Sequence, residues 1–285
     1  MPSLALDPGQ PFDLDLTLSC GQVFSWEKVG DTWRGVVGGN AVRVAQRGDR
    51  LVYSGVPRRF VRDYFALDVD LPSILSEIDI DPVIGRAISR CAGLRIVRQP
   101  PWECLASFIC ATYASIPGIR KRVSLLREYL GEPVPGGEPG LHAFPSVDAV
   151  ARAGDDLIRR CRLGYRARYL AETARILSGR PGWAEEIASL PSPEARRELQ
   201  KLPGVGMKVA DCVLLFSLGK GEAFPVDIWI KRAVEELYFG GQTMPIKQVY
   251  DFGKRFGKYA GYAQEFLYYY ARTRRIGAPE VARTQ

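Results

Sequence analysis

The stretch that decides the fold reads Leu202-Pro203-Gly204-Val205-Gly206-Met207-Lys208-Val209-Ala210-Asp211-Cys212. We expect one helix to end near Lys201 and another to begin near Met207, with a tight Pro-Gly-Val-Gly turn between them. Glycine permits positive φ angles and lets the backbone approach another surface closely. The free N–H groups of the turn and of the second helix would then suit a phosphate. An ordinary turn between helices explains the same residues, because Gly-x-Gly alone is a weak signal.

Lys208 falls in the first turn of the second helix, where the helix dipole disfavours a cation. Such a lysine is either tolerated at a solvated surface or is kept neutral for a purpose. Cys212 follows four residues later and therefore shares a helix face with Lys208. Considered alone, this cysteine is more typical of a small core residue than of a reactive thiol.

Asp227 can come close to Lys208 although the two are far apart in the sequence. A helix over residues 207–218 is about 18 Å long at roughly 1.5 Å per residue. The chain from Gly219 to Asp227 can span about 26 Å when extended, so it can return alongside this helix. Asp227 is also a good N-cap for a helix predicted at 228–238, and capping would fix the position of its carboxylate.

The first part of the chain predicts an antiparallel sheet. Residues 12–18 alternate between apolar and polar types, which is typical of a strand. Further strands are expected on either side of Gly38-Gly39-Asn40, a hairpin-turn composition, and at residues 51–53. Several short strands joined by tight turns favour an antiparallel arrangement.

From about residue 80 the pattern becomes helical. Asp81 and Pro82 predict a helix start, and Gly93 lies after its end. Further helices are expected at 101–115, 119–130, 147–152, 167–178, 192–201, 207–218, 228–238, 246–257 and 261–274. Residues 132–140 contain three prolines and three glycines and predict a loop. The sequence therefore indicates an α+β chain.

The composition limits the possible functions. Hydrophobic residues make up 46% and charged residues 25% of the 285 residues, as in ordinary globular proteins. The net charge of +7 permits a polyanionic partner but does not identify one. The sequence contains no apolar run of the roughly 18–20 residues that span a bilayer and no recognisable secretion signal. We therefore expect an intracellular protein of the cytoplasm, nucleoid or nucleus, with no membrane partner.

The cysteines are scattered and form no C-x-x-C pair. They are Cys20, Cys91, Cys104, Cys110, Cys161 and Cys212. This spacing predicts reduced, buried thiols rather than a disulfide framework. With His142 as the single histidine, and in a predicted loop region, no metal centre is expected.

Taken together, these motifs resemble the helix-hairpin-helix superfamily of DNA glycosylases, and within it 8-oxoguanine DNA glycosylases. The resemblance rests on the hairpin with its lysine, on Ala-Asp-Cys after it, and on Pro225-Val226-Asp227. Further matching segments follow in family order and are Ser19–Trp26, Glu103–Cys110, Gly164–Tyr169 and Tyr259–Gln264. The match runs from about residue 12 to 274, which is nearly the whole chain.

The resemblance implies a twisted antiparallel sheet, like half of the TATA-binding-protein fold, followed by a helical glycosylase domain. We expect a β-rich domain with flanking helices at 1–97 and a helical domain at 98–285. The second domain would hold the helix-hairpin-helix at about 192–218 and the loop that carries Asp227.

The resemblance also implies a bifunctional enzyme of base excision repair. It would flip 8-oxoguanine out of double-stranded DNA, excise it and then cleave the strand as an AP lyase. Lys208 would be the neutral amine that attacks C1′ and forms a Schiff base, from which β-elimination follows. Asp227 would stabilise positive charge on the sugar and assist proton transfer. The family needs no cofactor or metal for these steps, and a monomer is expected.

Matching positions suggest the pocket for the flipped-out base. The backbone carbonyl of Gly21 would accept the N7–H that distinguishes 8-oxoguanine from guanine. Gln264 would bind the Watson–Crick edge, while Cys212 and Tyr268 would sandwich the ring. Tyr268 lies in a run of three tyrosines and could instead belong to the core.

Other matching positions suggest contacts with the duplex. Tyr165 would wedge into it, and Arg166 would hydrogen-bond the orphaned partner base, although Arg166 and Arg168 could instead form a solvated basic face. The hairpin residues that would hold a phosphate are Gly204, Val205 and Gly206.

The chain departs from the family pattern at three positions. Relatives that strictly prefer cytosine opposite the lesion carry an Asn and an Arg where this sequence has Tyr113 and Gly118. Trp229 stands where some relatives have a phosphate-contacting His. We expect Tyr113 to fill the vacated space, and selectivity for the partner base to be relaxed.

Three other functions fit the residues less well. A glycosylase for alkylated purines shares the architecture but typically lacks the lysine, so Lys208 disfavours it. Adenine and thymine-glycol relatives usually carry a C-terminal four-cysteine iron–sulfur cluster, whereas no cysteine follows Cys212. A non-catalytic DNA-binding module would need the hairpin alone, and the presence of both Lys208 and Asp227 disfavours it.

Overall fold

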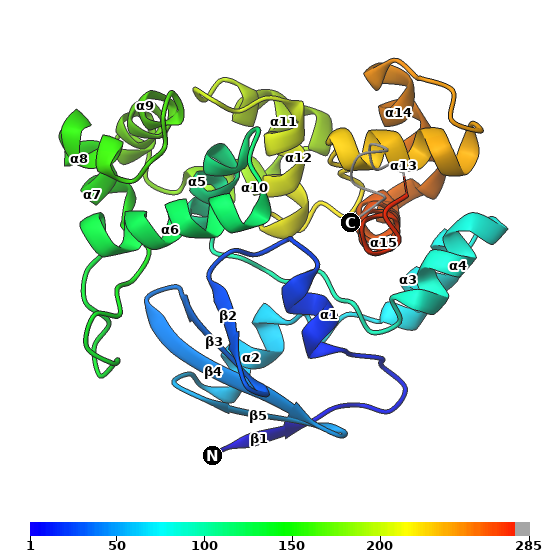
Figure 1. Cartoon of the computed structure of the whole chain (residues 1–285), viewed down its shortest axis with the longest axis horizontal. Coiled ribbons are helices and arrows are strands. Elements are labelled where there is room, and N and C mark those ends of the chain that lie inside the picture. The colour runs from blue at the N-terminus through cyan, green and yellow to red at the C-terminus, as the bar shows by residue number, and fades with distance from the viewer. Residues whose placement is uncertain (277–285) are drawn as a thin grey trace.

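A five-stranded antiparallel sheet forms one end of the molecule, and helices form the rest (Figure 1). The computed structural model describes residues 1–276, except for the side chains of residues 155–157. In spatial order the strands are β1 (Ser3–Ala5), β5 (Arg50–Ser54), β4 (Asn40–Arg47), β3 (Thr32–Val37) and β2 (Trp26–Val29). The predicted hairpin is confirmed, because Val37 pairs with Asn40 and the two glycines between them have positive φ angles of 54° and 78°. The predicted strand at 51–53 lies within β5.

The prediction of a strand over residues 12–18 is wrong. The segment forms helix α1 (Leu14–Ser19), and the carboxylate of Asp13 caps it by accepting from Leu16 N at 2.8 Å. Leu14, Thr17 and Leu18 are buried, which is the i, i+3, i+4 spacing of one helix face. The alternating pattern fits either period over so short a segment, and the cap together with this burial decides for the helix.

Short helices also lie where the sequence predicts none. They are α2 (Arg58–Tyr64), α3 (Leu71–Ile78), α8 (Asp155–Arg160) and α10 (Trp183–Ser189). The helical part thus begins before residue 80. Helices of this length are marginal in isolation, so tertiary packing stabilises them. In α3, for example, Leu71, Ile74 and Ile78 are all buried.

The longer predicted helices are confirmed with small shifts at their ends. They are α4 (Pro82–Arg90), α5 (Pro101–Ala111), α6 (Ile116–Leu130), α7 (Val147–Arg152), α9 (Arg166–Ser178), α11 (Ser192–Gln200), α12 (Met207–Phe216), α13 (Ile228–Tyr238), α14 (Ile246–Gly253) and α15 (Ala260–Thr273). The helix predicted at 101–115 ends early, because Tyr113 has a φ of 48°. The helix predicted at 246–257 is divided into α14 and a 3₁₀ helix, η1 (Lys254–Tyr259), in which Gly257 has a φ of 59°.

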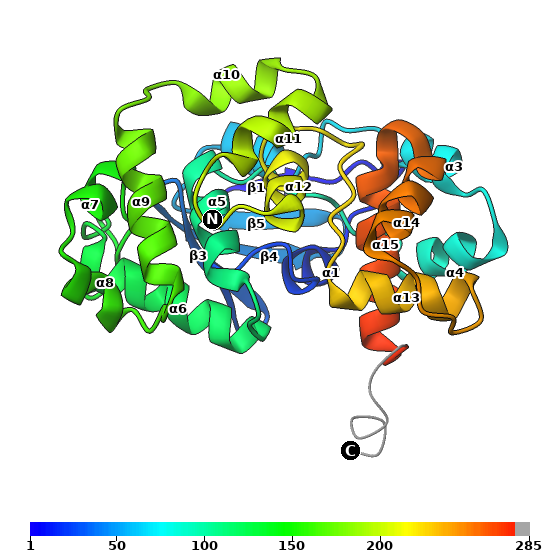
Figure 2. The same cartoon turned by 90° about the horizontal axis from the view of Figure 1, so that it is seen from above.

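The helices pack around a central pair, α5 and α12, which lie above the sheet (Figures 1 and 2). On one side of this pair stand α7, α8 and α9, and on the other side α13, α14 and α15. Helices α3 and α4 come from the first third of the chain, yet they pack against α15, the last helix of the chain. The domain division at residue 97 stays a prediction. The structure therefore confirms the α+β class, with the sheet first and the helices after it.

Three further predictions concern thiols, membrane-spanning helices and metal ions. All six cysteines are buried and none forms a disulfide, as the sequence predicts. Within the described part of the chain, no helix combines the length and the apolar character needed to cross a bilayer. Among residues 1–276, leaving aside the side chains of 155–157, no cluster of three or more His, Cys, Asp or Glu side chains could hold a metal ion.

Candidate active site

The turn between α11 and α12 has the geometry that its glycines predict. Gly204 has a φ of 78°, and a Cβ there would lie 2.7 Å from the Cβ of Tyr169, so both conformation and space require glycine. No atom lies within 4 Å of the Cβ position of Gly206, which is exposed. Gly206 is the N-cap residue of α12 and has no side chain with which to cap the first turn. The N–H groups at this helix start therefore face outward without a side-chain acceptor, which suits an anion.

Lys208 is half-buried at the start of α12, against α5. Its Nζ lies 4.7 Å from the centre of the Phe108 ring, which also contacts the rings of Phe24 and Phe216. The amine thus lies over an aromatic face at the centre of the molecule, where cation–π attraction holds it in place.

Cys212 lies one helical turn beyond Lys208 and is buried. Burial raises the pKa of its thiol to about 12, although the positive charge of Lys208 lowers it and the negative charge of Asp227 raises it. The thiol is therefore protonated at neutral pH. Because both charges act on this one sulfur, the structure brings Lys208, Cys212 and Asp227 together.

Asp227 caps α13, as the sequence predicts. Its Oδ1 accepts from the backbone N of Trp229 at 2.9 Å and of Ile230 at 2.8 Å. Neither of these two bonds uses Oδ2. The cap therefore fixes the orientation of the carboxylate while leaving one oxygen for another role. The Asp227 charge also raises the pKa of the Tyr268 hydroxyl, which burial raises more strongly.

Helix α15 forms another wall of the same site. Gln264 is only 4% exposed, and its Oε1 has no hydrogen-bond partner in the described part of the chain. Tyr268 follows one turn later and lies beside Gly21, whose Cβ position is 3.5 Å from Tyr268 Cε1. Gly21 has a φ of 116°, a conformation that favours glycine. Residues predicted from distant motifs thus meet at one place.

Two residues at this wall are missed by the sequence analysis. Glu265 is 2% exposed, and burial raises the pKa of its carboxyl to about 7, against the lowering effects of Cys20 and Arg272. Arg272 donates from Nη2 to the carbonyl of Ser19 at 2.9 Å. A signal for Arg272 is present in the sequence, because residues 264, 268 and 272 are spaced by four and share one helix face.

The predicted contacts with a duplex lie at the outer edge of the site. Tyr113 is 97% exposed at the turn before α6, and Tyr165 is 54% exposed just before α9. Arg166 is buried instead, and its Nε donates to the carbonyl of Thr112 at 2.8 Å. Its guanidinium lies 4.4 Å from the centre of the Tyr165 ring. Arg166 therefore holds the backbone beneath the two tyrosines rather than forming a solvated basic face.

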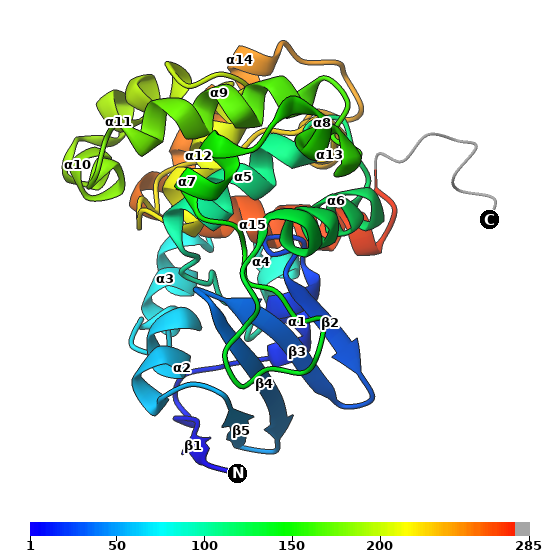
Figure 3. The same ribbon diagram turned by 90° about the vertical axis from the view of Figure 1, so that its left-hand side faces the viewer.

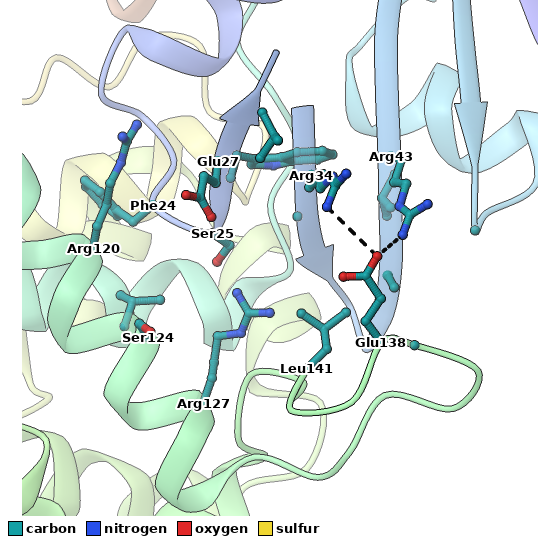
Figure 4. Close-up of a pocket in the computed structure, with 18 of the residues that line it drawn as sticks. Phe24, Ser25, Glu27, Arg34, Arg43, Arg120, Ser124, Arg127, Glu138 and Leu141 are labelled. Carbon is teal, nitrogen blue, oxygen red and sulfur yellow. Dashed lines mark hydrogen bonds and ion pairs between the residues drawn. The ribbon is translucent and has the colours of Figure 1, made fainter. Parts of the chain in front are cut away.

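A hollow of about 800 Å³ opens elsewhere, between the sheet, α6 and the loop that follows α6 (Figure 4). Figure 3 shows this loop reaching across the sheet, where Glu138 forms ion pairs with Arg34 and Arg43. Phe24 lines the hollow and packs edge-on against Phe108 at 5.5 Å. None of the residues predicted for the site lines this hollow.

Comparison with known families gives two matches that together cover most of the chain. The 8-oxoguanine DNA glycosylase N-terminal domain matches residues 4–105. The HhH-GPD superfamily of base excision DNA repair proteins matches residues 111–256.

Individual proteins agree with these matches. The chain is 33% identical to the N-glycosylase/DNA lyase OGG1 of Arabidopsis thaliana, over 90% of this chain and 76% of that protein. It is 29% identical to a probable N-glycosylase/DNA lyase of Methanothermobacter thermautotrophicus, over 93% of this chain and 95% of that protein. The 8-oxoguanine glycosylase/lyase of Clostridium acetobutylicum, solved with dsDNA containing cytosine opposite 8-oxoG, superposes with a TM-score of 0.87 at 35% identity, over 93% of each chain.

Proposed function

Because this chain belongs to the 8-oxoguanine DNA glycosylase family, whose members are N-glycosylases and DNA lyases, we propose that it excises 8-oxoguanine from double-stranded DNA and then cleaves the strand. The observation that carries this proposal is the convergence of an amine and a capped carboxylate on one site. Lys208 and Asp227 reach it from different helices and both act on the Cys212 thiol. The wall formed by Gly21 and Tyr268 stands beside them.

The proposed reaction begins with the unprotonated amine of Lys208 attacking C1′ of the damaged nucleotide. The N–C1′ bond forms as the glycosidic C1′–N9 bond breaks, and the base leaves with the bonding pair and gains a proton. The C1′–O4′ bond then breaks, O4′ takes up a proton, and the opened sugar is left joined to Lys208 through a protonated C1′=N bond, the Schiff base. Loss of a proton from C2′ expels the 3′ phosphate by β-elimination, and water releases the enzyme. Asp227 stabilises the positive charge that develops on the sugar during the first step.

The proposed pocket for the flipped-out base uses Gly21, Cys212, Gln264 and Tyr268. The Gly21 carbonyl accepts N7–H of the lesion, and the amide of Gln264 pairs with the Watson–Crick edge. The unpartnered Oε1 of Gln264 supports this, because a buried acceptor without a donor is costly and a base N–H would satisfy it. Cys212 offers a neutral thiol to one face of the base, and Tyr268 offers its ring to the other.

The proposed DNA contacts lie outside this pocket. The hairpin amides of Gly204 and Gly206 hold a backbone phosphate, and Trp229 lies beside the same strand. Val205 does not offer its amide as the sequence suggests, because its N–H donates to the carbonyl of Leu202 at 3.1 Å and closes the turn. Tyr165 wedges into the duplex and Tyr113 fills the gap opposite. Arg166 reaches the partner base only if it gives up its bonds to Thr112; otherwise it supports the two tyrosines. We propose that the enzyme acts as a monomer.

Borohydride trapping tests the central step. A duplex that contains 8-oxoguanine should become covalently attached to the protein when the Schiff base is reduced, and Lys208→Gln should abolish the adduct. A non-catalytic DNA-binding module would leave no adduct with any duplex. A hydrolytic glycosylase would also leave none but would release the base, so trapping together with an assay of base release separates all three functions.

A further inference from the structure

Arg272 belongs to the same face of α15 as the proposed base-binding residues. Gln264, Tyr268 and Arg272 follow one another at intervals of four residues, so each lies one turn after the previous one. The guanidinium of Arg272 lies 5.5 Å from the centre of the Tyr268 ring. Arg272 is therefore the third residue of the stripe that faces Gly21, and the reaction as described assigns no role to it.

One arm of Arg272 fixes the position of Gly21. Its Nη2 donates to the carbonyl of Ser19 at 2.9 Å, and Ser19 is the last residue of α1. A helix leaves its last carbonyls without partners in the helix, and this bond satisfies one of them. The bond joins the end of α15 to the short segment that carries Gly21, although the two lie at opposite ends of the chain.

The other arm of Arg272 has no acceptor. Its Nη1 is shut off from solvent and makes no hydrogen bond with any described residue. It lies 3.0 Å from the position that a Cβ of Gly21 would occupy, so only a residue without a side chain leaves this arm undisturbed. Arg272 also interacts with the nearby Tyr268 hydroxyl, whose pKa it lowers against the larger effect of burial, but Nη1 itself makes no hydrogen bond with a described residue. An unsatisfied buried cationic donor costs free energy, and an acceptor supplied by a ligand would remove that cost.

We propose that Nη1 of Arg272 donates to a carbonyl oxygen on the Hoogsteen edge of the flipped-out base, next to the N–H that Gly21 accepts. This inference rests on the proposed function and deepens it. The edge of 8-oxoguanine presents O6, N7–H and O8 in that order. One backbone carbonyl and one cationic donor, side by side, are complementary to an N–H with a neighbouring oxygen. The substrate class is therefore an oxidised purine with that pair of groups.

The surroundings of Arg272 make a buried cation tolerable before the base arrives. The face of Tyr268 attracts the guanidinium. The carboxyl of Glu265, whose pKa burial raises and Arg272 lowers, supplies part of a countercharge. The guanidinium is thus held in place by a carbonyl, a ring and a nearby carboxyl, with one arm left for the substrate.

The test compares two steps that differ in their need for the base. Arg272→Met keeps an unbranched apolar stem but removes the guanidinium and all its donors. Single-turnover excision of 8-oxoguanine should fall about thirtyfold, which corresponds to a hydrogen bond from a charged group. Cleavage of a duplex with a preformed abasic site needs no base contact and should stay within about threefold of wild type. Arg274→Met, two residues further on and exposed, is the matched control and should leave both rates unchanged.

Arg272→Lys guards against a folding defect because it keeps the charge. One ammonium cannot reach both Ser19 and the base, so excision should be slowed less than in Arg272→Met, and abasic cleavage should be retained. Unchanged excision in Arg272→Met, or an equal fall in both steps, would overturn the base contact. If wild-type protein neither excises nor cleaves, the proposed function itself has failed, which is a different result.

Measurements of DNA binding identify which oxygen of the flipped-out base, O6 or O8, accepts from Nη1 of Arg272. The affinities of Lys208→Gln and of the double variant Lys208→Gln/Arg272→Met should be measured with 8-oxoguanine and guanine duplexes. Equal losses with both duplexes assign O6, which both bases carry. A loss confined to 8-oxoguanine assigns O8 when Lys208→Gln/Arg272→Lys, which keeps a donor for Ser19, also loses affinity; full affinity in that variant would show that the loss comes from a displaced Gly21 and would overturn the contact. No loss with either duplex would overturn the contact.

Discussion

The interior of the site and its outer edge are built in different ways. In the interior, Lys208, Asp227 and Gly21 come from separate segments, and each is fixed by burial, a cap or backbone conformation. At the edge, Tyr113 and Tyr165 are exposed, and Arg166 beneath them donates to main-chain carbonyls. The interior residues belong to the motifs on which the resemblance rests, and so do Tyr165 and Arg166 at the edge, whereas Tyr113 departs from the pattern. We therefore expect changes in the interior to affect the reaction most, and changes at the edge to affect recognition of the partner base.

The strongest test of the interior is Lys208→Gln. It should abolish both excision and borohydride trapping, because no other amine is placed to attack C1′ in the proposed reaction. DNA affinity should stay within about tenfold of wild type, since hairpin amides rather than Lys208 supply the phosphate contacts. Single-turnover assays and binding titrations measure both effects, with Lys254→Gln on the surface as the control. Normal excision by Lys208→Gln would disprove the nucleophile assignment.

Asp227→Asn separates the two roles of the interior carboxylate. Asn caps a helix as well as Asp does, so α13 and the thermal midpoint should be preserved. Excision should nevertheless fall at least about a hundredfold if the negative charge stabilises the sugar cation. A single-turnover rate close to that of wild type would show that Asp227 is a cap and nothing more.

Glu265 makes the interior sensitive to pH. Its folded-state pKa of about 7 lies above the ordinary value of 4.5, so the folded protein binds this proton more tightly than the unfolded chain. The free energy of unfolding should therefore decline as the pH rises from 4.5 to 7 and be level above that. The shift corresponds to at most about 3 kcal/mol.

Glu265→Gln removes this titration and should be more stable than wild type at pH 8 by up to that amount, with little difference at pH 4.5. Denaturant unfolding at both pH values measures the difference. If wild type and variant lose stability equally over this range, Glu265 is not the group that titrates.

Much of the fold and of the interior of the site could be predicted from the sequence, because short local patterns encode them. The glycines of the hairpin, the lysine two residues after them and the cap at Asp227 each carry their own short-range signal. The strand predicted over residues 12–18 was wrong because an alternating pattern over seven residues fits either a strand or a helix. The cap at Asp13 favours the helix that forms there. Arg166 and Arg272 depend on carbonyls from distant segments, and no short-range pattern reveals such partners.

The smallest expected effect concerns the outer edge and the base opposite the lesion. Strict selection for cytosine needs donors and acceptors matched to its exposed edge, and each unmatched contact costs roughly 1–3 kcal/mol. By the resemblance, Tyr113 and Gly118 stand where strictly selective relatives carry an Asn and an Arg, and the Nε of Arg166 donates to the carbonyl of Thr112. Stacking by Tyr113 tolerates any base, since every base has a π-face. Excision opposite A, G or T should therefore lie within about thirtyfold of that opposite C, as single-turnover rates on four duplexes will show. A preference for C above about a thousandfold would mean that Arg166 leaves Thr112 to read the partner base, or that residues outside this edge do so.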